Sequence, residues 1–320
     1  MSRALYIRAV AVRAWRTLLL LLLVAPWPSA EAQERRRREA AGEATQEFTH
    51  AGRPRRYLVR VPPSLTRGAR VPLVIVLHGG GGDGHNAEKM TGFTVRAMAE
   101  RFIVVYPDGT SRRGPLLTWN AGHCCGPAME DRVDDVGFIN ALIDTLSARH
   151  PIDPARIYAT GISNGAMMSH RLGIELSHRL AAIAPVVGAL FGDEARPANP
   201  VSAIIINGML DASVPFNGGP PGGRAARAWE GKPARPSLEQ ATFWASAAWC
   251  TVPPQRSTRG AVTRTVYTCP SGQAVEHYAV ADNGHAWPGG KAGSVTGDPP
   301  SSSMNATDVI WRFFAAHPKR

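Results

Sequence analysis

The sequence predicts one α/β domain with a mostly parallel central sheet and helices on both faces. Three observations lead to this prediction. Short apolar runs rich in β-branched residues alternate with segments of helical spacing along nearly the whole chain. The run Val71–His78 is apolar almost throughout, which is typical of a central strand buried on both faces. Pro- and Gly-rich stretches at 213–236 and 288–300 are flanked by core-like patterns, so we expect loops there and no boundary between domains.

The first half of the chain follows this alternation closely. We expect, in order, strands at 57–61 and 71–78, a helical pattern to about residue 101, a strand at 102–106, a long loop to about residue 132, and a helix at 134–148. Pro and Gly bound the first two strands. The last helix is indicated by Phe138, Leu142 and Leu146, which recur at helical spacing.

The second half continues the pattern to the end of the chain. We expect a strand at 156–160, a helix from residue 164, strands at 182–187 and 201–207, a helix at 237–248, strands at 260–269 and 275–280, and a last helix from residue 305. Asn305 is a suitable N-cap for that last helix, and Pro318 is expected to end it.

The N-terminus has the three-part order of a secretory signal peptide. Four arginines precede the apolar run Leu18–Ala25, and the small residues that follow end in Ala30-Glu31-Ala32. We expect cleavage after Ala32, because the apolar run is shorter than the ~20 residues that a membrane-spanning helix needs. The expected organisation is a signal peptide at 1–32, a basic N-terminal tail at 33–54 and a catalytic domain at 55–320, exported to the periplasm or the extracellular space without stable membrane insertion.

The chain is basic, with a formal net charge of +11. Part of this charge is the block Arg35–Arg38, which we interpret as a solvated tail. The sequence contains no nucleic-acid-binding motif, so a nucleic-acid partner is not expected. A non-catalytic protein that binds anionic cell-wall polymers through its basic surface is one alternative to an enzyme.

Four cysteines allow three disulfide connectivities in an exported chain. We favour a bridge between Cys250 and Cys269, and a crossed pairing of Cys124 or Cys125 with Cys250 remains open. A bridge between the adjacent Cys124 and Cys125 would be strained, because a trans peptide separates their Cα atoms by only ~3.8 Å. No cysteine spacing matches a zinc site, and we expect no metal and no organic cofactor.

Gly161-Ile162-Ser163-Asn164-Gly165 lies between an expected strand and an expected helix. In that context, flanking glycines permit the sharp turn that exposes a serine oxygen for nucleophilic attack. Ser163 is therefore the candidate nucleophile.

His78-Gly79-Gly80-Gly81-Gly82 ends the most apolar strand. In serine hydrolases, a loop at this position supplies backbone N–H groups to the oxyanion. We expect the amide of Asn164, together with that of Gly80 or Gly81, to form the oxyanion hole.

A nucleophilic serine needs a base and an orienting carboxylate, here in the chain order Ser, acid, His. Among the histidines downstream of the possible acids, His285 lies in a loop just after the last expected strand, whereas His277 lies within a strand and His317 ends a helix. Asp211 follows the strand at 201–207, at the sheet edge where α/β proteins build their sites. The rival acids are Asp193, Glu194 and Asp282.

These motifs together resemble the secreted esterases grouped as poly(3-hydroxybutyrate) depolymerases and feruloyl or acetylxylan esterases of the α/β-hydrolase fold. The resemblance rests on the Gly161–Gly165 turn, on Asp211, and on the segments Leu77–Gly80, Tyr106–Gly109, Trp119–Gly122, Cys124–Gly126, Asp134–Ile139 and Gly284–Gly289. It implies a triad of Ser163, Asp211 and His285, and ester hydrolysis through an acyl-enzyme.

The substrate is less well defined by the residues. Trp119 and Trp287 flank the expected site and, with His78, are candidates for substrate contact, although ordinary packing is an equal alternative for the two tryptophans. Asp134 and Asp135 begin a helix, where a structural role is favoured. Hydroxybutyrate esters or oligomers and feruloyl or acetyl esters of plant polysaccharide remain open as substrates. A secreted serine peptidase with the same triad is a second alternative, and the oligomeric state is not predicted.

Overall fold

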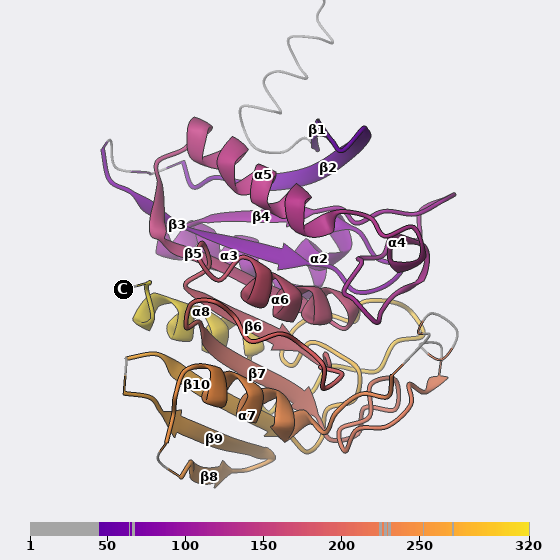
Figure 1. Ribbon diagram of the computed structural model, residues 1–320, viewed down its shortest axis with the longest axis vertical. Coiled ribbons are helices and arrows are strands. Elements are labelled where there is room, and N and C mark those ends of the chain that lie inside the picture. Colours follow the sequence, from indigo (N-terminus) through magenta and orange to yellow (C-terminus); the bar gives the residue numbers. More distant parts are fainter. Residues whose placement is uncertain are drawn as a thin grey trace, which may run out of the picture.

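The computed structural model describes residues 45–63, 65, 68–223, 226, 229, 232–251, 253–270 and 272–319. The expected signal peptide at 1–32 and most of the expected tail lie outside the described residues. Figure 1 shows one twisted sheet with helices packed on it, in the strand order β1-β2-β4-β3-β5-β6-β7-β10-β9-β8.

The centre of the sheet is parallel and both of its ends are antiparallel. The parallel strands are β4 (Ile103–Pro107), β3 (Val71–Leu77), β5 (Ile152–Ile162), β6 (Ala182–Val186), β7 (Ser202–Gly208) and β10 (Ala274–Val280). The antiparallel strands are β1 (Gln46–His50) and β2 (Arg53–Arg60) at one end, and β9 (Val262–Thr268) and β8 (Gln255–Arg259) at the other. Since all residues of β3, β4, β6 and β7 are buried, these strands have no solvent-exposed face.

Helices cover both faces of the sheet. The helices are α2 (Gly84–Thr91), α3 (Phe93–Glu100), α4 (Gly126–Glu130), α5 (Asp135–Arg149), α6 (Asn164–Glu175), α7 (Ser237–Ala247) and α8 (Ala306–Ala316). One core cluster joins α5, α6 and α7 to the sheet, in front of it in Figure 1, and the other joins α2, α3 and α8 to the opposite face. Alternate residues of β3 pack into the two core clusters on opposite faces of the sheet. Leu73 and Ile75 lie in the first cluster, and Val74 and Val76 lie in the second. This arrangement confirms the predicted fold class.

The elements that sequence reasoning missed are short or polar. β1 and the start of β2 lie in the segment 33–54 that we expected to be a tail, and that expectation is wrong for 46–54. Phe48 holds β1 to the domain, with its ring centroid 5.5 Å from that of Phe138. Every residue of β8 is exposed, so this strand has no apolar pattern to reveal it. The helical pattern before residue 101 is two helices, because Gly92 turns the chain with φ 68°.

The structure pairs Cys250 with Cys269, which joins the end of α7 to the end of β9. It pairs Cys124 with Cys125, so the crossed pairings left open by the sequence are not found. The peptide between Cys124 and Cys125 is cis, and their Cα atoms lie 3.0 Å apart.

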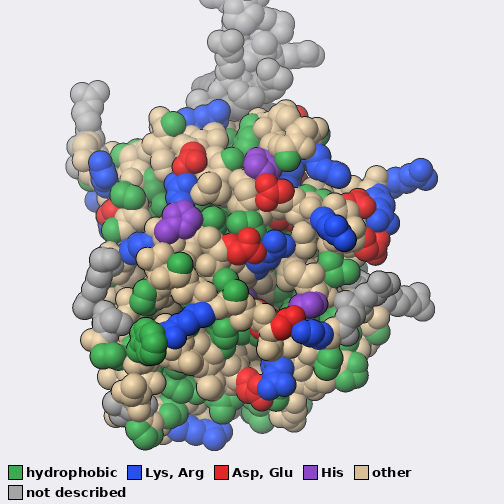
Figure 2. All heavy atoms as spheres, viewed as in Figure 1, with side chains coloured by type: hydrophobic (Ala, Val, Ile, Leu, Met, Phe, Trp, Pro, Cys, Tyr) green, Lys and Arg blue, Asp and Glu red, His purple; other side chains and the backbone are tan. Residues whose placement is uncertain are grey.

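The surface in Figure 2 carries basic and acidic side chains interspersed over the α5–α7 face, without a continuous basic stripe on that side. Over the described part of the chain, no helix has the length and apolar character needed to cross a membrane.

Candidate active site

Ser163 occupies a sharp turn between β5 and α6. Its backbone has φ 56° and ψ −122°, a conformation that non-glycine residues rarely adopt. Two hydrogen bonds hold the turn, from the Ser163 amide to the carbonyl of Val186 (3.0 Å) and from the Met167 amide to the carbonyl of Ser163 (3.0 Å). The serine side chain is thereby presented at the carboxyl edge of the sheet, as the nucleophile turn predicts.

The two glycines of the turn are required by close backbone packing. A Cβ atom at Gly161 would lie 2.6 Å from the carbonyl oxygen of Gly165 and 2.8 Å from that of Leu77. A Cβ atom at Gly165 would collide with the carbonyls of Leu77 and His78. Because these neighbours are main-chain atoms, of α6 and of the end of β3, they cannot move aside as a flexible side chain would.

The structure brings Ser163, His285 and Asp211 into one hydrogen-bonded chain. His285 Nε2 lies 2.8 Å from Ser163 Oγ, and His285 Nδ1 lies 2.7 Å from Asp211 Oδ2. Asp211 follows β7, and His285 follows the neighbouring strand β10. The carboxyl ends of parallel strands thus place three residues that are far apart in sequence at one edge of the sheet. The Asp211 side chain is 1% exposed and that of His285 is 20% exposed.

Backbone amides orient the Asp211 carboxylate. Oδ1 accepts hydrogen bonds from the amides of Ser213 and Val214, each at 2.8 Å. This leaves Oδ2 for the imidazole of His285. The Asp211 loop also bonds to the base loop, because the Leu210 amide donates to the carbonyl of Asn283 (3.0 Å).

Two residues that sequence reasoning missed hold the base loop. Asp298 Oδ2 accepts a hydrogen bond from the His285 amide at 2.6 Å. The side-chain amide of Asn283 is fully buried and donates to the carbonyls of Gly284 (2.8 Å) and Ala286 (3.0 Å). Asn283 adjoins the histidine motif and could have been noticed, but the chain offers no local signal for a contact from Asp298.

The rival acids and bases are engaged elsewhere. Asp193 contacts His123 and Lys232, Glu194 accepts the amides of Phe191 and Gly192, and Asp282 accepts the hydroxyls of Ser301 and Ser303. His277 is buried beside Ser237 (3.2 Å), and His317 contacts the carbonyl of Phe313 (2.7 Å). Desolvation lowers the pKa of His277 to about 4.

The loop after β3 lies against the nucleophile turn. A Cβ atom on Gly79 would be 3.5 Å from Ser163 Cβ, and one on Gly80 would be 3.8 Å from Asn164 Cβ. Gly81 is not available as an oxyanion donor, because its amide donates to the carbonyl of Leu117 (2.7 Å). Gly80 remains as the expected partner of Asn164, whose amide lies in the first turn of α6, where no intrahelical acceptor exists.

The three residues expected to contact substrate are each 0% exposed. His78 Nε2 accepts from the Gly109 amide (2.9 Å), and burial lowers the pKa of His78. Trp119 Nε1 donates to the carbonyl of His78 (3.0 Å), and Trp287 Nε1 donates to Thr307 Oγ1 (3.0 Å). The structure therefore corrects this expectation: these side chains fill the core behind the site and present no surface to a substrate.

Among the residues that the structure describes, no group of three or more His, Cys, Asp or Glu side chains could hold a metal ion.

Comparison with known proteins identifies the family. A family model described as esterase PHB depolymerase matches residues 56–215, a segment that contains Ser163 and Asp211. The putative esterase NocK of Nocardia uniformis subsp. tsuyamanensis is 31% identical over 287 residues, which cover 82% of this chain and 81% of NocK. The chain belongs to the esterase PHB depolymerase family. This membership confirms the resemblance that the motifs predicted.

A second relative and a solved structure extend the comparison. Feruloyl esterase B of Piromyces equi is 31% identical over 247 residues, which cover 75% of this chain but only 44% of that esterase. The chain thus spans less than half the length of this family relative. The acetyl xylan esterase from Aspergillus awamori superimposes with a TM-score of 0.58 at 14% identity, over 85% of this chain and 99% of that one. At this identity the superposition shows a shared fold.

Proposed function

We propose that this protein is an exported serine esterase in which Ser163, His285 and Asp211 hydrolyse carboxylic esters through an acyl-enzyme. The observation that carries the proposal is the chain of hydrogen bonds from Asp211 to His285 (2.7 Å) and from His285 to Ser163 (2.8 Å). Membership in an esterase family supports the same reaction class.

The geometry supports a separate role for each member of the proposed triad. The carboxylate of Asp211 accepts the Nδ1 proton of His285, which leaves Nε2 unprotonated and able to take the proton of Ser163 Oγ. The serine oxygen then attacks the ester carbonyl, and the resulting oxyanion is bound by the amides of Asn164 and Gly80. The tetrahedral intermediate collapses, and His285 returns the proton to the departing alcohol. Water repeats the sequence on the acyl-enzyme and releases the acid.

The proposed substrates are esters of the kinds that the relatives' names indicate. Feruloyl or acetyl esters of plant polysaccharide and hydroxybutyrate esters both fit this reaction. We also propose export after cleavage near Ala32, because the sequence before Gln33 has the order of a signal peptide. The proposed catalytic region then runs from β1, at residue 46, to residue 320.

The test compares the wild-type 33–320 protein with Ser163→Ala on p-nitrophenyl acetate and butyrate, methyl ferulate, a hydroxybutyrate trimer and a peptide anilide. Ser169→Ala is the matched control, because this buried serine of α6 donates to the carbonyl of Gly165 in its own helix. We expect Ser163→Ala to lose ester turnover and the control to keep it, and the preferred ester then names the substrate class.

Other outcomes would contradict the proposal. Full turnover by Ser163→Ala would exclude Ser163 as the nucleophile. Cleavage of the anilide at rates comparable with the esters would favour the peptidase alternative. Resistance of the wild type to a serine-directed fluorophosphonate would favour the non-catalytic wall-binding alternative.

A further inference from the structure

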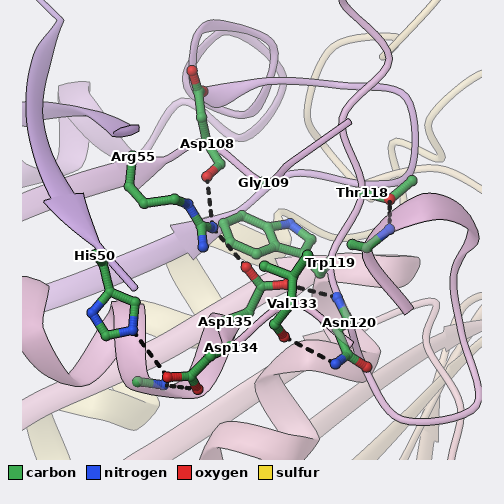
Figure 3. Close-up of polar contacts among 12 residues, drawn as sticks. His50, Arg55, Asp108, Gly109, Thr118, Trp119, Asn120, Val133, Asp134 and Asp135 are labelled. Carbon is green, nitrogen blue, oxygen red and sulfur yellow. Dashed lines mark hydrogen bonds and ion pairs between the residues drawn. The ribbon is translucent and has the colours of Figure 1, made fainter. Parts of the chain in front are cut away.

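We infer that Asp135, paired with Arg55, is a positioning residue that fixes both oxyanion donors through the dipeptide Trp119-Asn120. The inference rests on the proposed function, because it concerns the oxyanion hole of that reaction. Figure 3 shows Arg55 of β2 reaching Asp135 in the first turn of α5, with Trp119 and Asn120, from the loop that follows β4, beside this pair.

A buried ion pair holds the Asn120 end of the dipeptide. Arg55 Nη2 donates to Asp135 Oδ1 at 2.6 Å, and the two side chains are 1% and 0% exposed. The other oxygen, Asp135 Oδ2, accepts the Asn120 amide at 2.8 Å (Figure 3). One carboxylate therefore joins a charged partner on the sheet to a main-chain amide of the loop.

The Trp119 end of the dipeptide holds Asn164, the first proposed oxyanion donor. The Trp119 amide donates to Asn164 Oδ1 (2.7 Å), and Asn164 Nδ2 donates back to the Trp119 carbonyl (3.0 Å). This reciprocal pair fixes the side chain of Asn164, which is 1% exposed. The backbone amide of the same residue is the donor next to Ser163.

The second proposed donor is held by the same tryptophan. Trp119 Nε1 donates to the carbonyl of His78 at 3.0 Å, and the His78 ring contacts the carbonyl of Gly79 at 2.7 Å and accepts from the Gly109 amide. These contacts set the path of the chain as it enters Gly80. A shift of Trp119 would consequently move both halves of the oxyanion hole together.

The two aspartates at the start of α5, Asp134 and Asp135, have different roles. Asp134 is the N-cap and accepts the Gly137 amide (2.9 Å), which is the structural role expected from the sequence. Asp135 instead points inward. Desolvation raises its pKa, and Arg55 opposes that rise by favouring the charged carboxylate. The Arg55 guanidinium in turn lies 3.8 Å from the centroid of the Phe138 ring.

The test uses two double variants that differ only in the acceptor offered to Asn120. Arg55→Met/Asp135→Asn removes both buried charges but keeps an oxygen that can accept the Asn120 amide. Arg55→Met/Asp135→Leu has the same number of side-chain heavy atoms and the same branching, and it removes the acceptor as well. Removing both charges together avoids leaving an unpaired buried ion, which by itself destabilises a fold strongly. Arg264→Met/Glu276→Gln, which breaks an ion pair between β9 and β10, is the control for loss of an ion pair away from the site.

Two readouts separate positioning from stability. Active sites are titrated with a fluorophosphonate at 10 °C so that only folded enzyme is counted, and kcat, KM and inhibition by butylboronic acid are then measured. The boronate adduct of Ser163 is tetrahedral and carries an oxygen in the oxyanion hole, so its affinity reports on the two donors.

We expect the Leu variant to lose about 100-fold in kcat, as for loss of an oxyanion donor, with a similar loss of boronate affinity and KM within about twofold. The Asn variant and the control should stay within about threefold of wild type on both measures. Equal kcat and boronate affinity for the Leu and Asn variants would overturn the inference, whatever their melting temperatures.

If the Leu variant does not fold, Asn120→Ala/Arg171→Met provides the test. It removes the bond from Asn120 Nδ2 to the Val133 carbonyl (2.9 Å) and that from Arg171 Nη1 to the Asn120 carbonyl (2.8 Å), which also hold the dipeptide. A fall in kcat of about fivefold at constant KM is expected, and unchanged kcat would refute the inference. Failure of the proposed function would appear separately, as wild type that resists the fluorophosphonate or as Ser163→Ala that retains turnover.

Discussion

His170 is expected to make this protein lose stability as the pH falls from 7 to 5. It is buried in α6, where His170 Nδ1 accepts from Trp244 Nε1 (2.9 Å) and Nε2 contacts Gln240 Oε1 (2.9 Å). Because Nδ1 must accept, only the neutral ring fits this arrangement. Desolvation lowers the pKa of His170 to about 4.

Proton linkage gives the sign and the magnitude of this change in the free energy of unfolding. Between about pH 6.5 and pH 4 the unfolded chain binds a proton at His170 that the folded protein does not, so acid favours unfolding. With a folded pKa of about 4, the loss between pH 7 and pH 5 is about 2 kcal/mol. The buried His277, whose pKa is also lowered to about 4, adds a similar loss.

The assay is urea unfolding from pH 7.5 to pH 5 for wild type, His170→Gln and His178→Gln, the last at an exposed position of the segment after α6. We expect wild type and His178→Gln to lose about 2 kcal/mol more than His170→Gln between pH 7 and pH 5. If the free energy of His170→Gln falls as steeply as that of wild type, His170 is not held neutral and the reasoning is refuted.

Three further changes test other parts of the structure. Cys250→Ser/Cys269→Ser opens a bridge with a sequence separation of 19 and should lower the free energy of unfolding by about 3 kcal/mol, measured in urea without reductant; an unchanged value would mean that the bridge does not form in solution. Asp211→Asn should lower kcat by about 10⁴-fold with little change in melting temperature, because the amide can still accept from the loop but favours the wrong imidazole tautomer; near-normal kcat would remove Asp211 from the triad. Gly165→Ala should cost about 3 kcal/mol or prevent folding, since its methyl group would meet the carbonyls of Leu77 and His78, and a normal melting temperature would contradict the packing of the turn.

The sheet and the proposed triad could be predicted because their signals are local. Buried parallel strands are apolar along their length, and the residues that follow them converge at one edge of the sheet, so Ser163, Asp211 and His285 could be chosen from chain order and position alone. β8 could not be predicted, because an exposed edge strand has no buried face to leave a pattern.

The surroundings of the site were harder to predict because they depend on side-chain direction and long-range contacts. Trp287 lies next to the base loop in sequence, but its ring packs on Phe93 in the core, 6.1 Å between centroids. The sequence could not distinguish Gly80 from Gly81 as an oxyanion donor. The distinction rests on the hydrogen bond from the Gly81 amide to the carbonyl of Leu117, which lies in another loop. The pairing of Arg55 with Asp135 spans 80 residues, and neither residue has a local motif that indicates the other.

The backbone of Ser163 has a consequence for engineering this protein. A serine held at positive φ costs roughly 1–3 kcal/mol that a glycine at the same position would avoid. A search for heat-resistant variants by melting temperature alone would therefore favour Ser163→Gly, which lacks the proposed nucleophile. Selection for thermostability and selection for turnover act in opposite directions at this residue, so stabilising libraries should hold residue 163 fixed and be screened for ester hydrolysis at each round.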